Sequence, residues 1–205
     1  MAAHTYSYFV VAAVIAARLE KATRIARHLS ITASNARALA FRAGEGASGF
    51  RPLTDYIHRL ADLTVSSSSR INHLASELSR TAAEKERAER ALRHFVDVGE
   101  RAKDSPFIDS LQPVFERTSQ RQCVLRDAYN SQIKLLTSEL DTLEGELRAA
   151  GVLATMSRVE ALQADGVYQQ ALNNVADNVE SVTASIKKHI QSSQTLVQQL
   201  TQELS

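Results

Sequence analysis

The sequence predicts an all-α protein in which long antiparallel helical hairpins form a four-helix bundle or coiled coil. The composition is the first indication, because the 205 residues include no Trp, three Pro and seven Gly, and residues that favour helices dominate. The second indication is a set of apolar stripes that recur with helical periodicity over long segments. Breaks in these stripes predict helix reversals near residues 44–51, 99–105 and 150–152.

The first hairpin is expected within residues 1–99, with its turn near residues 44–51. Its first helix runs from about Tyr6 to Ala43, and its second helix starts at Pro52, since proline suits the first helical turn. The second helix carries a seven-residue repeat that is typical of coiled coils. The seam of this repeat consists of Ile57, Leu60, Thr64, Ser67, Ile71, Leu74, Leu78, Ala88, Leu92 and Phe95.

The second hairpin is expected within residues 100–205. Ser105 is a suitable N-cap with Pro106 behind it, and this pair predicts the start of the third helix. Pro113 should kink or restart that helix, because proline lacks the backbone N–H that a helix interior needs.

The third reversal is expected at a glycine. The stripe of the third helix continues to about Ala149, and Gly151 should then end the helix as a left-handed cap. The fourth helix runs from about Ala154 to Leu204, and Asp165-Gly166 weakens the helical pattern in its first third.

Two assemblies are compatible with four apolar stripes. The chain could close all four stripes on each other in an up-down-up-down bundle, or extended hairpins could pair in a homodimer. The second half has no glycine-rich tip of its own, so it is not a plain duplicate of the first half. We therefore expect the second half to supply the two helices that a dimer partner would otherwise provide.

The most informative motif lies within residues 25–64. Arg42-Ala-Gly-Glu45 is followed by Gly49-Phe50, and Asn35-Ala36 stands upstream of it. This pattern resembles the hairpin tip of bacterial chemoreceptors (methyl-accepting chemotaxis proteins) and aligns with it without a gap over about 40 residues. In that family the histidine kinase and its coupling protein dock at this tip.

The chain departs from the family pattern at several contact positions. Leu39 stands where the family has a Glu that helps to join receptor dimers into trimers, and Tyr56 stands where the family has a second tip Glu. Pro52 stands where the family has a Val two residues after the Gly-Phe pair. The resemblance therefore implies a turn that is kept and a contact surface that is partly changed.

The resemblance implies a non-enzymatic signalling or scaffold module that binds array proteins through this tip. Its implied partners are a chemotaxis histidine kinase, a coupling protein or chemoreceptors. The residues implied in protein binding are Asn35, Arg42, Gly44, Glu45, Gly49, Phe50, Arg51 and Tyr56. The alternative is a structural helical-bundle adaptor that is unrelated to chemotaxis.

Several residues near the turn also have a plainer interpretation. Arg42 and Glu45 flank the turn, where they either form a bidentate ion pair or remain solvated. Phe50 is expected to pack beneath the turn rather than to contact a partner. His28 and His58 could face each other across the hairpin, and a solvated or core pair is favoured over a shared metal site.

Charge and cysteine content argue against several other classes of function. The net charge of +1 implies no bulk attraction to nucleic acid or to anionic membranes. The uncharged run at residues 6–17 is too short to span a bilayer, and no Lys or Arg precedes it as in a signal peptide. We therefore expect a cytoplasmic protein without stable membrane insertion, and the lone Cys123 fits a reducing compartment. No phosphate loop, metal triad or nucleophile–base pair is visible, so neither an enzyme nor a cofactor is expected.

Overall fold

The computed structural model describes residues 8–102, 108–164 and 166–202, and within them the chain forms helices and no strand. The predicted all-α fold class is confirmed. The elements in chain order are α1 (Tyr8–Arg42), the 3₁₀ helix η1 (Gly44–Ala47), α2 (Phe50–Arg101), the 3₁₀ helix η2 (Ile108–Leu111), α3 (Gln112–Ala161) and α4 (Gly166–Gln202).

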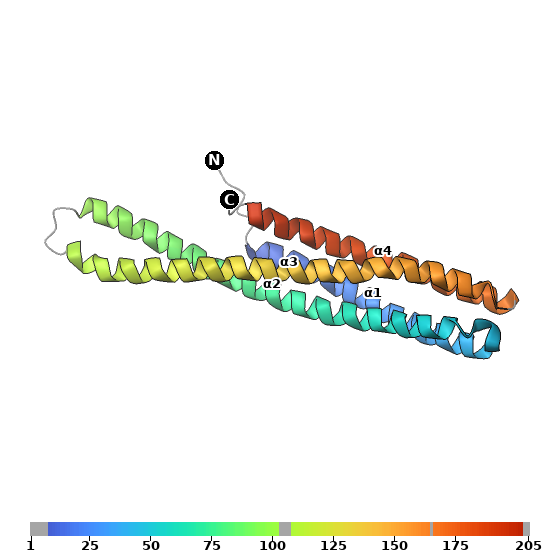
Figure 1. Ribbon diagram of the computed structural model, residues 1–205. Coiled ribbons are helices and arrows are strands. Elements are labelled where there is room, and N and C mark those ends of the chain that lie inside the picture. Colours follow the sequence, from blue (N-terminus) through green and yellow to red (C-terminus); the bar gives the residue numbers. More distant parts are fainter. Residues whose placement is uncertain (1–7, 103–107, 165, 203–205) are drawn as a thin grey trace.

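The four long helices run antiparallel to their neighbours and surround one core (Figure 1). Helix α1 packs against α2 and α4, and α3 packs against the same two helices from the opposite corner. The four stripes therefore close on each other within a single chain, as in the first of the two assemblies that the sequence allowed.

Small and large side chains share this core. The buried stripe of α1 near the tip is built from alanines such as Ala33, Ala36 and Ala40, which let neighbouring helices approach closely. Helix α3 contributes large side chains to the same core, and its Leu136 and Leu140 are both 0% exposed. Each fully buried leucine stabilises the fold by roughly 1.5–3 kcal/mol relative to an exposed one.

The predicted second reversal can be compared with the structure only in part. Ser105 and Pro106 lie outside the described residues. Helix α3 begins after η2, with Pro113 in its first turn. The restart predicted at Pro113 is therefore confirmed, because proline is tolerated at that position of a helix.

The third reversal is not at Gly151, and that prediction is wrong. Gly151 lies inside α3, which continues to Ala161, and α4 begins at Gly166 rather than at Ala154. Leu153 and Ala161 extend the buried stripe of α3 past the glycine. A glycine costs a helix interior only about 1 kcal/mol, so this burial keeps the helix intact.

The helices differ in length, and this difference shapes the molecule. Helices α2 and α3 have 52 and 50 residues, whereas α1 and α4 have 35 and 37. As a result, α2 and α3 extend together beyond the ends of α1 and α4, on the side away from the turn at residues 43–49 (Figure 1). No helix in the described ranges has the length and apolar character needed to cross a membrane.

Candidate functional site: the hairpin tip

The turn between α1 and α2 is compact. Helix α1 closes with a hydrogen bond from the Ala43 amide to the Leu39 carbonyl (2.9 Å), and Gly44 then adopts a φ of +70°. The turn continues as η1, and the Ser48 amide donates to the Glu45 carbonyl at 3.1 Å. A residue that has a β-carbon is strained at positive φ. Gly44 has none, so it allows the chain to reverse here.

Two side chains anchor the turn from below. Ala47 and Phe50 are both 0% exposed and belong to the core of the bundle. The expectation that Phe50 packs beneath the turn is confirmed. A buried phenyl ring below a short turn fixes the backbone that presents the neighbouring exposed side chains.

The reversal of the second hairpin supports the turn from the side. A β-carbon added to Gly46 would lie 2.9 Å from the backbone carbonyl oxygen of Gln163, which is closer than real β-carbons approach. A β-carbon on Gly49 would lie 2.0 Å from a carboxylate oxygen of Glu160, a side chain that can move. The glycines of the turn thus differ. Gly44 permits the left-handed backbone conformation, whereas Gly46 and Gly49 allow the second hairpin to pack closely against the turn.

Below the tip, Arg158 holds α3 against α4. Its guanidinium contacts the carboxylates of both Glu180 and Asp177, the latter at 2.8 Å. These hydrogen bonds, from Glu180 first and Asp177 second, raise the pKa of Arg158 further above its ordinary value. The second hairpin therefore forms a fixed support for the first near the turn.

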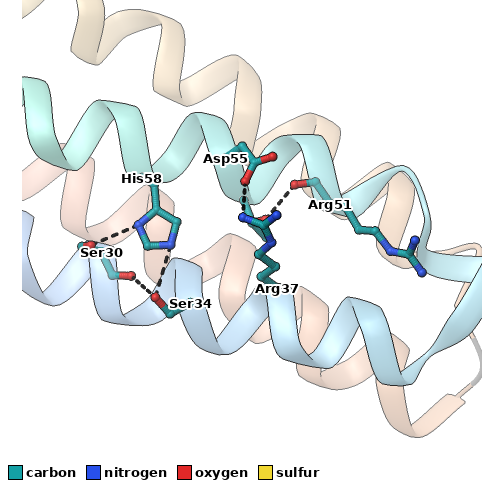
Figure 2. A network of polar contacts seen from close by, with 7 residues as sticks. Ser30, Ser34, Arg37, Arg51, Asp55 and His58 are labelled. Atoms are coloured by element: carbon teal, nitrogen blue, oxygen red, sulfur yellow. Dashed lines mark hydrogen bonds and ion pairs between the residues drawn. The ribbon is translucent and has the colours of Figure 1, made fainter.

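A polar strip joins α1 to α2 just behind the turn (Figure 2). Arg37 donates to the carboxylate of Asp55 at 2.7 Å. Further from the turn, the two ring nitrogens of His58 lie 3.1 Å from the Ser30 hydroxyl and 3.2 Å from the Ser34 hydroxyl. His28 is exposed on α1, and both ring nitrogens of His58 are engaged by serines rather than by His28.

One aromatic ring of the tip remains largely exposed between two cations. The Phe41 side chain is 54% exposed, and the Arg51 guanidinium lies 4.5 Å from its ring centroid. The Arg37 guanidinium lies 6.0 Å from the same centroid. Sequence reasoning missed Phe41, although its place off the Ala33, Ala36 and Ala40 stripe was a usable signal that it points outward.

The predicted tip residues fall into three groups by exposure. Asn35, Arg42 and Glu45 are exposed; Gly44, Gly49, Arg51 and Tyr56 are partly buried; and Phe50 is buried. No ion pair joins Arg42 to Glu45 at this turn, so the solvated alternative describes both side chains. Asn35 lies on α1 about two turns before Arg42, on the same side of that helix.

Comparison with models of known protein families and with curated proteins finds no match to this chain. Within the described residues, no group of three or more His, Cys, Asp or Glu side chains is placed to hold a metal ion. The features of the tip that bear on function are thus its shape, its support by buried Phe50 and the second hairpin, and its exposed charges.

Proposed function

We propose that this chain is a non-enzymatic signalling or scaffold module of the cytoplasm that binds chemotaxis-type array proteins through its hairpin tip. The partner classes are a chemotaxis histidine kinase, its coupling protein or chemoreceptors. One observation carries the proposal: the left-handed turn at Gly44 presents Arg42 and Glu45 as exposed, opposite charges on a backbone fixed by buried Phe50.

The physical basis of binding is a rigid turn with uncommitted side chains. Binding residues concentrate on short loops held by a rigid scaffold, because little conformational entropy is then lost on association. Arginine and aromatic side chains dominate the binding energy of protein interfaces, and Arg51 stacked on exposed Phe41 supplies both beside the turn. The sequence motif that resembles the chemoreceptor tip lies at this same turn.

A structural adaptor is the second candidate function, and one feature of the surface favours it. Helix α3 and the residue directly after it expose four large apolar side chains near the reversal of the second hairpin. They are Val152 at 62%, Met156 at 50%, Val159 at 55% and Leu162 at 66%. An adaptor that uses this flank would not depend on the charges at the turn.

The experiment that separates the two functions is a binding assay with defined partners. We would immobilise the purified kinase or coupling protein from the same genome and measure binding of wild-type protein, Glu45→Lys and Arg42→Glu. Each substitution is expected to weaken binding at least tenfold, about 1.4 kcal/mol or more, as for residues near the centre of an interface.

A matched control keeps the charge change and moves it away from the tip. Asp62 is exposed on the shaft of α2 and takes part in none of the ion pairs of that helix, so Asp62→Lys should leave binding unchanged. All variants should keep wild-type helix content and melting temperature. Binding that survives both tip substitutions would reject the tip as the docking surface and would leave the adaptor function.

A further inference from the structure

Within the described residues, the end of the molecule opposite the tip contains two helices instead of four. We call this part the overhang and define it as residues 89–101 of α2 with residues 108–128 of η2 and α3. Ala88 and Tyr129 are buried, but no described residue between them is. The overhang is therefore the part of α2 and α3 that α1 and α4 do not cover, as Figure 1 shows.

The apolar stripe of α2 resumes beyond the point where the cover stops. On α2, Ala75, Leu78 and Ala82 are 1–3% exposed, and the same spacing of three and four residues leads through the charged Lys85 and Glu89 to Leu92 and Val96. Leu92 is only partly buried and Val96 is 52% exposed. The stripe is therefore apolar again within the overhang, where α1 and α4 no longer cover it.

The facing helix repeats this pattern. Phe115 and Leu125 of α3 continue its buried stripe but are only partly buried, and Val114 is 41% exposed. Near the end of the overhang, an open cleft of about 240 Å³ separates the two helices. Its lining is mostly apolar and consists of Phe95, Gly99, Ile108, Leu111, Gln112 and Phe115.

We propose that the overhang is a dimerisation surface whose occupant is the overhang of a second copy, laid antiparallel to the first. The described parts of α1 and α4 do not reach this end, and a second overhang supplies two helices of equal length. In the dimer the four-helix core continues without a break from one molecule into the other. This inference is independent of what the tip binds.

Charge and length both favour a second copy. The described residues of the overhang contain six arginines and six aspartates or glutamates, so two overhangs carry no net charge and do not repel each other. A strongly acidic or basic partner, in contrast, would find no complementary field there. The overhangs must overlap in antiparallel orientation, with one tip at each end of the rod. In a parallel arrangement, neither overhang would occupy the positions that α1 and α4 leave open on the other.

The dimer would be a long rod with one tip at each end. Helix α2 alone is about 78 Å long at 1.5 Å per residue, and the overlap is about 20 Å, so the tips would lie roughly 130 Å apart. Two tips on one stiff rod can bind two partners at once, which raises avidity only for partners that are themselves arrayed at matching distances.

The primary test is the mass of the full chain in solution, by sedimentation equilibrium and light scattering. We expect wild-type protein to have twice its 22.5 kDa monomer mass. Val96→Glu and Val114→Glu place a charge in the proposed interface and should each weaken dimerisation at least tenfold. Val152→Glu is the matched control, because Val152 is 62% exposed on α3 outside the overhang, and it should remain dimeric.

The single native cysteine gives the orientation. Cys123 is exposed and lies in the overhang, so spin labels on Cys123 should lie within about 30 Å of each other in the dimer, after sedimentation shows that labelling preserves it. Labels placed by Ser48→Cys in a Cys123→Ser background should show no short distance. A monomeric wild type, a dimer that survives both valine variants, or a short distance between Ser48→Cys labels would each overturn the proposal.

Discussion

The two ends of this molecule carry the same kind of helical stripe and bury it to different degrees. Toward the tip, four helices surround the stripe of α3, and Leu136 and Leu140 are 0% exposed. In the overhang, α2 and α3 are the only long helices among the described residues, and Phe115 and Leu125 of the same stripe are partly buried. These four side chains are all apolar, so the number of neighbouring helices, rather than their residue type, decides how far they are buried.

This difference predicts an uneven stability along the rod. Regions with few buried apolar contacts open locally at a lower free energy than the core does. The tip lies at the well-packed end, which suits a surface that must keep one shape. The overhang lies at the poorly packed end, which suits a surface that gains its stability from association.

The largest expected effect comes from truncating matched leucines of α3. Leu140→Ala should lower the free energy of unfolding by about 2–5 kcal/mol, because it removes a fully buried side chain and leaves a cavity. Leu125→Ala should cost less than about 1.5 kcal/mol, because solvent already reaches that side chain. Urea unfolding followed by circular dichroism measures both.

These measurements belong in the Val96→Glu background, in which self-association cannot stabilise the overhang. Equal losses for Leu140→Ala and Leu125→Ala in that background would show that the two ends are packed equally well. In the wild-type background, a larger loss for Leu125→Ala than in Val96→Glu would indicate that dimerisation buries this side chain.

The asymmetry between the ends depends on a boundary that the sequence does not reveal. Residue pattern correctly predicted four helices, the first turn and the restart at Pro113. If the third reversal were at Gly151, however, the fourth helix would be longer than the third. The fourth helix, rather than α3, would then extend beyond the bundle. The position of one reversal therefore decides which helices form the overhang.

Gly151 and Gly44 show why such a boundary is hard to predict. Each is a glycine within an apolar repeat, but only Gly44 has a positive φ. Tertiary packing decides between a helical glycine and a capping glycine: Leu153 and Ala161 bury their side chains when α3 continues. The reversal beside Gln163 must also reach Gly46 of the first hairpin, and no local pattern contains that contact.

For the tip, the sequence predicted the turn and its anchor, but its fine geometry comes from the second hairpin. Phe50 was correctly expected in the core. The closeness of Gln163 to Gly46 and the stacking of Arg51 on Phe41 join segments from different helices or hairpins. Such contacts depend on the relative rotation of the helices, which hydrophobic periodicity fixes only within about one residue step.

An intermediate effect is expected from the two glycines that look alike in sequence. Gly44→Val should destabilise the fold by about 1–2 kcal/mol or more and distort the turn, because a β-branched residue is strained at positive φ. Gly151→Ala should stabilise it by up to about 1 kcal/mol, since an added β-carbon there meets open space within a helix. Thermal unfolding of both variants measures this contrast, and a loss of stability in Gly151→Ala would contradict the continuous α3.

The smallest expected effect is a difference in acid sensitivity between the covered part and the overhang. In the covered part, Gln194 and Gln191 of α4 donate to the carboxylate of Glu144 at 3.1 and 3.0 Å, and these hydrogen bonds lower its pKa below the ordinary 4.5. In the overhang, burial raises the pKa of Glu89, but the hydrogen bond and charge of Lys85, together with Gln122 and Arg93, outweigh it, so that this pKa is also lowered. Both carboxylates remain charged in the folded protein at a pH that protonates them in the unfolded chain.

The sign of the effect follows from these lowered pKa values. Their stabilisation is complete above pH 4.5 and is lost as the pH falls through the folded pKa, because the unfolded chain then binds more protons. Glu144→Gln should therefore cost about 1 kcal/mol or less at pH 7 and make the decline of stability between about pH 5 and 3 shallower. Glu89→Gln should have the same effect more weakly. The hydrogen bond that Gln122 donates to Glu89 from the other helix is long at 3.5 Å, and the main partner of Glu89, Lys85, lies on the same helix as Glu89. Urea unfolding at several pH values measures both slopes, and a slope that Glu144→Gln leaves unchanged would show that the glutamines of α4 do not hold this carboxylate in solution.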